Sequence, residues 1–155
     1  MELVLYPDER LRQNCTNVVK KERKELAHLA AQMYPFMLEK DGAGLAAIQI
    51  GIPKRFFVIK KGLLPFGHTV VINPKIKDIF GQSYLTSEGC LSFPGLLLEV
   101  ERFSTIFVEY EDWRGRLYSS GLNDFSAQVF QHEVDHLNGK VMTDHFTKLI
   151  LSERV

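Results

Sequence analysis

The pentapeptide His132-Glu133-Val134-Asp135-His136 is the feature that most restricts how this chain can fold. It lies in the segment 124–138, whose apolar residues recur at helical spacing and which ends before a glycine. Residues four apart lie on one face of a helix, so His132 and His136 can present two imidazoles to one divalent ion. Glu133 then lies beside them, within reach of a water molecule on that ion. The pattern predicts a metal-binding helix with a proton-transferring carboxylate.

Two histidines leave a divalent ion short of ligands, and the chain offers several candidates for a third. Metzincin proteases place a third histidine six residues after the second, but that position is Met142 here. Gluzincin proteases use a downstream glutamate, and the only glutamate after His136 is Glu153, close to the C-terminus. Asp144 is an alternative oxygen ligand. Cys90 is the strongest candidate, because thiolate sulfur suits zinc or iron(II).

A segment of small residues, 42–49, reads Gly-Ala-Gly-Leu-Ala-Ala-Ile-Gln and fits a dinucleotide-binding pattern. That pattern should follow a strand and needs an acidic residue about 20 positions on. Here it follows a helical segment, and no Asp or Glu occurs between Asp41 and Asp78. The remaining interpretations are a plain loop or an active-site wall against which a peptide backbone can pair closely. In the second case Gln49 offers an N–H donor for an oxyanion.

The order of periodic segments predicts an α+β fold with an antiparallel or mixed sheet. A helix is expected from Glu22 to Lys40, ended early or kinked by Pro35, and a second from Asp124 to Asn138, ended by Gly139. Between them the β-branched and aromatic residues predict five strands: Arg55–Ile59, Thr69–Ile72, Leu97–Val100, Thr105–Tyr110 and Leu117–Ser120. No repeat or flexible linker divides the 155 residues, so one domain is expected.

Composition excludes several classes of protein. Hydrophobic residues make up 45% and charged residues 25%, which is typical of a folded globular chain. Nineteen basic and nineteen acidic residues cancel, which argues against binding to a phosphate backbone. No apolar run approaches the ~18 residues that a membrane span needs, and residues 1–7 do not resemble a secretory signal. We therefore expect a cytoplasmic protein, with Cys15 an incidental thiol.

Three segments, GAGLAAIQ, EGCLS and QHEVDH, together with the opening Tyr6–Arg12, resemble the signature motifs of the peptide deformylase family in order and spacing. The resemblance implies one catalytic domain over residues 1–155, with sheets packed around a central metal-binding helix. Members of this family remove the N-formyl group from the formyl-methionine of nascent polypeptides and release formate. The implied partners are N-formylated nascent peptides, met transiently near the ribosome, with neither nucleic acid nor membrane bound directly.

The resemblance also implies a role for each matching residue. One divalent ion, with water as its fourth ligand, is held by three residues: Cys90, His132 and His136. Glu133 acts first as general base and then as general acid, while Gln49 and the backbone N–H of Leu91 receive the oxyanion. The other implied residues bind substrate or support the site: Ala43, Gly44, Phe125 and Val129 for substrate, and Glu88 with Arg102 as an ion pair.

The family often uses iron(II), and ligands of these types also accept zinc, nickel or cobalt. Only 16 residues follow Gly139, whereas many members carry a longer C-terminal helix that in some helps to recruit the enzyme to the ribosome, so the resemblance is to a short form. Two rival functions stay open. One is a small metallopeptidase with the same helix motif. The other is a binding protein with a structural metal, which needs a fourth protein ligand.

Overall fold

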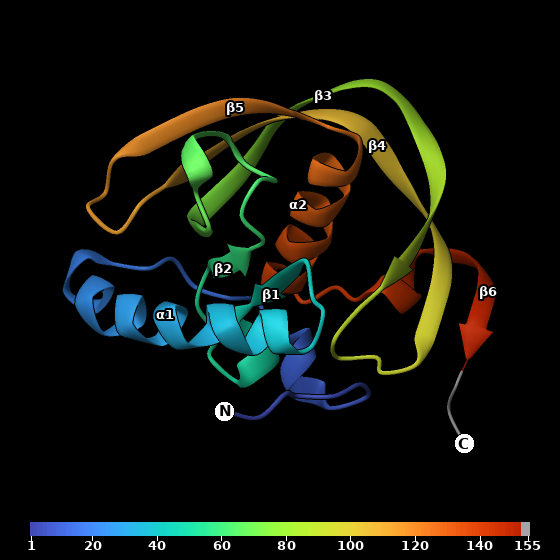
Figure 1. Cartoon of the computed structure of the whole chain (residues 1–155), viewed down its shortest axis with the longest axis horizontal. Coiled ribbons are helices and arrows are strands. Elements are labelled where there is room, and N and C mark those ends of the chain that lie inside the picture. The colour runs from blue at the N-terminus through green and yellow to red at the C-terminus, as the bar shows by residue number, and fades with distance from the viewer. Residues whose placement is uncertain (153–155) are drawn as a thin grey trace.

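The structure, a computed structural model, describes residues 1–152 and builds an antiparallel sheet around one helix (Figure 1). The main elements follow in the order α1 (Arg23–Glu39), β1 (Gly44–Ala46), β2 (Phe56–Ile59), β3 (Val70–Gly89), β4 (Leu96–Glu111), β5 (Leu117–Asn123), α2 (Asp124–Leu137) and β6 (Phe146–Ser152). Short 3-10 helices occupy Glu9–Arg12, Lys20–Glu22, Ala47–Ile50, Pro65–Gly67 and Met142–Asp144. The strand order is β1-β2-β3-β4-β5, and β6 pairs with the first part of β4, between Leu96 and Val100, away from β5.

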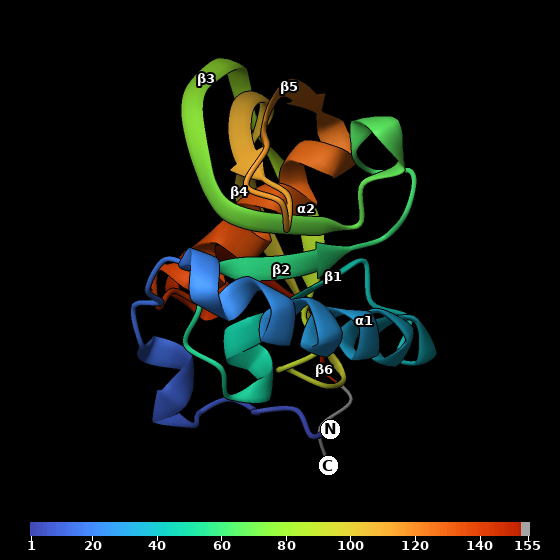
Figure 2. The same cartoon turned by 90° about the vertical axis from the view of Figure 1, so that its left-hand side faces the viewer.

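Helix α2 lies inside the molecule rather than on its surface. Strands β3, β4 and β5 arch over it, while β2 and then α1 lie below it (Figures 1 and 2). Phe130 of α2 packs edge-on against Phe57 of β2, with 5.3 Å between the ring centroids, and Val134 joins the same core. Ten of the fourteen α2 residues are buried, so a polar motif on this helix is forced into the interior.

Strand β2 separates two halves of the core. Phe57 and Ile59 belong to the cluster around α2, whereas Phe56 and Val58 belong to the cluster under α1. Alternate residues of a strand point to opposite faces, so a strand with all four residues apolar can be buried on both. This strand pairs with β1 and thereby holds the glycine-rich segment beside α2.

The predicted fold class and the helix 124–138 are confirmed, and Gly139, at φ +72°, ends that helix as expected. Pro35 does not end the first helix early, since α1 continues to Glu39. Pro35 lies on the exposed side of α1. Proline removes one backbone hydrogen bond from the helix, and on this side water can replace it. Met33 and Met37, on either side of it, are fully buried and keep both halves on the core.

The strand predicted at Arg55–Ile59 is confirmed as β2, but the other predicted strands are too short, and β1 was not predicted. Strand β3 extends to Gly89 rather than ending at Ile72, β4 is continuous where two strands were predicted, and β6 was not predicted. Beyond Ile72 the chain carries Pro74 and Gly81 and is largely exposed, so its pattern does not indicate a strand. Pairing with β4, through three irregularities of register, supplies the hydrogen bonds instead.

Neither α1 nor α2 is long and apolar enough to cross a membrane. The chain after Gly139 forms the 3-10 helix at Met142 and then β6, whose Leu151 pairs with Leu97 of β4. Glu153, one of the alternative metal ligands, lies outside the described residues.

The end of α2 generates a stability prediction. A Cβ at Gly139 would overlap the carbonyl oxygen of Arg12, and the positive φ is itself strained for any other residue. Gly139→Ala should lower the free energy of unfolding by about 2 kcal/mol or more, measured by urea denaturation. Gly62→Ala is the control, because Gly62 has φ +99° but nothing within 4 Å. Equal losses for the two variants would contradict the proposed overlap.

Candidate active site and metal centre

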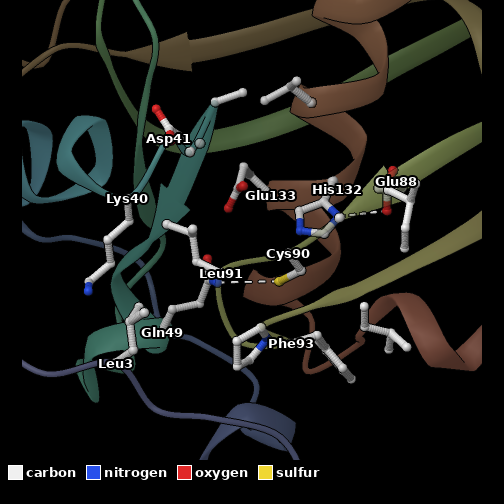
Figure 3. A pocket seen from close by; sticks show the side chains of 18 of the residues that line it. Leu3, Lys40, Asp41, Gln49, Glu88, Cys90, Leu91, Phe93, His132 and Glu133 are labelled. Carbon is white, nitrogen blue, oxygen red and sulfur yellow. Dashed lines mark hydrogen bonds and ion pairs between the residues drawn. The ribbon is translucent and has the colours of Figure 1, made fainter. Parts of the chain in front are cut away.

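A cavity of about 980 Å³ opens where α2, the β1 segment and the turn after β3 meet (Figure 3). Its walls include the three segments that the sequence singled out. Helix α2 contributes His132 and Glu133, the β1 segment contributes residues 42–44, and the turn contributes Cys90. Residues that lie far apart along the chain therefore share one cavity.

The three predicted metal ligands converge in this cavity. The Sγ of Cys90 lies 3.4 Å from Nε2 of His136, and that Nε2 lies 3.1 Å from Nε2 of His132. All three donor atoms lie within 4.8 Å of one another. A tetrahedral ion about 2.0–2.3 Å from its ligands holds neighbouring ligand atoms about 3.3–3.5 Å apart. The observed separations fit a single ion of this kind.

A buried carboxylate orients the first histidine. Nδ1 of His132 lies 2.7 Å from Oε2 of Glu88, whose side chain also accepts two hydrogen bonds, of 3.0 and 2.6 Å, from Arg102. Burial raises the pKa of Glu88, but His132 and Arg102 together lower it to about 2. The group is therefore an ionised acceptor, and Nδ1 of His132 must donate to it. Nε2 is left with its lone pair toward the metal position.

Arg102 extends this network back to α2. Its remaining Nη1 donates to Oδ2 of Asp135 at 2.7 Å, so one buried guanidinium bridges two carboxylates. Burial lowers the pKa of Arg102, and the two carboxylates more than offset this, so the group stays charged. The resemblance placed Glu88 and Arg102 together but left Asp135 unassigned. The signal in the sequence that could have identified Asp135 is its position within the helix motif, one residue before the predicted metal ligand His136.

The carboxyl of Glu133 is buried and poorly partnered. Its Oε2 has no hydrogen-bond partner among the described residues. Burial raises the pKa of Glu133 to about 7, even though nearby His132 lowers it. The side chain lies against β1, where a Cβ added to Gly44 would come within 2.6 Å of Oε1. A carboxyl of this kind can both accept and return a proton near neutral pH.

Gln49 presents the donor end of its amide to the site. Its Oε1 accepts a hydrogen bond of 2.9 Å from the N–H of Ala46, which fixes the orientation of the amide. Its Nε2 donates to Oγ of Ser92 at 3.1 Å and lies 3.5 Å from Sγ of Cys90 (Figure 3). Leu91 lines the cavity beside it. Ser92, fully buried, was not singled out from the sequence, since a lone serine after the cysteine carries no pattern.

The four residues expected to contact substrate line the same cavity: Ala43, Gly44, Phe125 and Val129. Val129 is buried, whereas Phe125 is 52% exposed and lies at the rim. Sequence reasoning missed other parts of the lining, which come from the N-terminal segment, the end of α1 and β6: Leu3, Leu5, Lys40, Asp41 and Leu151. None of these belongs to a motif, and only the fold brings them to the cavity.

The alternative ligands lie elsewhere. Asp144 pairs with Arg12 and is not part of the donor group, and Met142 is buried in a separate core cluster. Cys15 packs in the core around α2, and burial raises the pKa of its thiol to about 11. A thiol in that environment stays protonated and is a poor metal ligand.

Comparison with known proteins agrees with this geometry. The family model described as polypeptide deformylase matches residues 1–150. A peptide deformylase of Aquifex aeolicus is 42% identical over 146 residues, which cover 92% of this chain and 85% of the relative.

Solved structures give the same result. The crystal structure of peptide deformylase from Thermotoga maritima superposes with a TM-score of 0.87 at 39% identity, covering 95% of this chain and 97% of that one. The peptide deformylase of Acinetobacter baumannii, solved with Met-Ala-Ser bound, superposes with a TM-score of 0.85 at 30% identity over 94% of this chain and 97% of that one. On its motifs, its fold and these relatives, the chain belongs to the peptide deformylase family.

Proposed function

We propose that this chain hydrolyses the N-formyl group of formyl-methionine at the start of nascent polypeptides, using one divalent ion held by Cys90, His132 and His136. The observation that carries the proposal is the convergence of these three donor atoms at the wall of an open cavity, next to Glu133, whose Oε2 has no hydrogen-bond partner within residues 1–152. A cavity of this size accommodates several residues of an extended peptide.

The chain's residues can supply the proton transfers of amide hydrolysis. The ion, when bound, would polarise the formyl oxygen and lower the pKa of a water molecule toward ~7. Glu133 takes a proton from the attacking water. The same carboxyl then gives the proton to the departing amine, so that formate and a free amino terminus are released. Its raised pKa, near neutrality, suits both transfers.

Two donors are placed to stabilise the negative charge that develops on the formyl oxygen. Nε2 of Gln49 is held toward Cys90 by the bond between its Oε1 and Ala46, and the N–H of Leu91 follows Cys90 directly. A donor of this type contributes ~3 kcal/mol to transition-state stabilisation. Because both donors are preorganised, they need little rearrangement during the reaction.

The walls of the cavity favour a blocked amino terminus over an internal peptide bond. At Gly44 strand β1 approaches the Glu133 carboxyl so closely that no side chain fits between them, and we infer that only a small acyl group reaches this carboxyl. A formyl group carries only hydrogen on its carbonyl carbon. Ala43 and Gly44 would pair with the peptide backbone, and Phe125 with Val129 would enclose the methionine side chain.

One rival function is a scaffold protein with a structural metal. Structural zinc sites use four protein ligands, whereas the donor group within residues 1–152 has three members. The buried Oε2 of Glu133, without a partner within residues 1–152, is also costly to stability and has no use in such a site. These two observations favour a catalytic centre.

The identity of the ion is proposed from the types of the three ligand atoms, and the cellular setting is proposed from the composition of the chain. Iron(II) is the proposed physiological ion, with zinc, nickel or cobalt as substitutes, since one thiolate and two imidazoles accept all of them. The proposed setting is the cytoplasm, close to the ribosome, without direct contact to nucleic acid or membrane. A net charge of zero supports this. We treat residues 1–155 as a single catalytic domain.

The activity can be tested directly on the purified protein. With formyl-Met-Ala-Ser, we expect formate release that stops when a chelator removes the ion and resumes when iron(II) is added back under anaerobic conditions. Acetyl-Met-Ala-Ser and the unblocked peptide are the controls, and neither should be cleaved. Cleavage of internal bonds without formate would instead support the metallopeptidase.

The role of Glu133 predicts a separation between metal binding and turnover. Glu133→Gln should keep the ion, because Glu133 is not a ligand, yet kcat should fall at least about 100-fold. Cys90→Ser is the contrasting variant, and it should lose metal affinity. Metal content per chain and formate release check both. A Glu133→Gln variant with near-native kcat would remove Glu133 from the proton transfers.

The close approach of β1 to α2 predicts that Gly44 is irreplaceable. The Cβ of Gly44→Ala would lie 2.6 Å from the Glu133 carboxylate and displace it, so kcat/KM should fall at least about tenfold while the ion is retained. Gly121→Ala on β5 is the matched control, since a Cβ there meets nothing within 4 Å. Near-native activity of Gly44→Ala would contradict this prediction, because it would show that the cavity wall can move to accommodate the added Cβ.

A further inference from the structure

Gln128 is a buried polar residue for which the proposed reaction has no use. It lies on the face of α2 that borders the cavity, three residues after Phe125 and four before His132. Only 6% of it is exposed. An amide buried between apolar neighbours such as Phe125 and Val129 is costly unless its polar atoms have partners.

The side chain of Gln128 spans from α2 to β3. Its Oε1 accepts a hydrogen bond of 3.2 Å from Oγ1 of Thr86, and its Nε2 donates to the carbonyl of Ser87 at 3.1 Å. Ser87 itself lines the cavity. The amide therefore closes the cavity between these two elements, and it forms part of the wall that a substrate side chain would meet.

One hydrogen of this amide remains uncommitted. A glutamine NH2 has two N–H donors, and within the described part of the chain Nε2 of Gln128 has one acceptor, Ser87. Gln131, one turn later on α2, differs. Its Nε2 donates to the carbonyls of Phe103 and Ala127, and its Oε1 accepts from the N–H of Phe103. Gln131 is thus fully used in holding α2 to β4, whereas Gln128 keeps a donor beside the cavity.

We propose that Gln128 is a specificity-determining residue, which forms the polar end of the pocket for the first side chain and donates its remaining N–H to the methionine sulfur. The inference rests on the proposed function and deepens it. An apolar pocket cannot separate a thioether from a methylene group of the same shape. A buried N–H can, because a methylene leaves that donor without a partner.

Norleucine provides the test, since it replaces the sulfur of methionine by CH2. With formyl-Met-Ala-Ser and formyl-norleucyl-Ala-Ser, the wild-type chain should favour methionine about three- to tenfold in kcat/KM. Gln128→Leu should bring this ratio close to one. The change should appear in KM, because the contact is the same in the ground state and the transition state. A wild-type ratio of one, or an unchanged ratio in Gln128→Leu, would overturn the inference.

Two further measurements separate the contact from a general packing effect. Thr86→Val removes the bond to Oε1 but leaves the donor of Gln128, so its ratio should match the wild type. A ratio of one in Thr86→Val would show that selectivity follows packing, and the inference would fail. Thermal unfolding and metal content confirm that each variant is folded, and Gln128→Met replaces Gln128→Leu if the latter is not. If the wild type releases no formate from either peptide, the proposed function itself fails.

Discussion

The structure of the site depends on one buried carboxylate, that of Glu88. It lies on β3 and accepts two hydrogen bonds from Arg102 on β4 and a third from His132 on α2, so it joins three elements of the fold. Buried charges are stabilising only when every one has its partners. Asp135 completes the set by taking the remaining donor of Arg102. The hydrogen bonds of Glu88 therefore do two things at once: they orient the metal ligand His132, and they attach the sheet to α2.

Enclosure of α2 by the sheet makes the helix chemically useful. A surface helix with the same motif would leave its glutamate solvated, with an ordinary pKa. Here burial raises the pKa of Glu133 to about 7. At Gly44 the carboxyl of Glu133 occupies the space that a Cβ would fill. The proposed proton transfer and the proposed preference for a small acyl group both depend on how closely β1 packs on α2.

Gln128 and Gln131 show how the facing element decides what a side chain does. The two are one turn apart on the same helix and equally buried. Gln131 makes two hydrogen bonds to the backbone of β4 at Phe103 and a third to the carbonyl of Ala127 on its own helix, which together saturate its amide. Gln128 meets the end of β3 and the cavity, so its amide is only partly used by the protein. The same residue type is structural in one place and available to substrate in the other.

The sequence by itself determined the local features of this protein. The spacing of His132 and His136, the α2 segment and its end at Gly139 follow from contacts within one or two turns, which periodicity and a single glycine encode. Local pattern left Asp144 and Glu153 open as third ligand beside Cys90, which the ligand chemistry of its thiolate favoured and the motif resemblance then implied. Tertiary structure decided what depends on distant pairing: the 46-residue separation that brings Cys90 to His136, the full lengths of β3 and β4, strand β6 and the continuation of α1 past Pro35. Local sequence patterns could not predict these features. Hydrogen bonds between strands and burial against a facing element outweigh the weak helix or strand propensities of polar segments that contain glycine or proline.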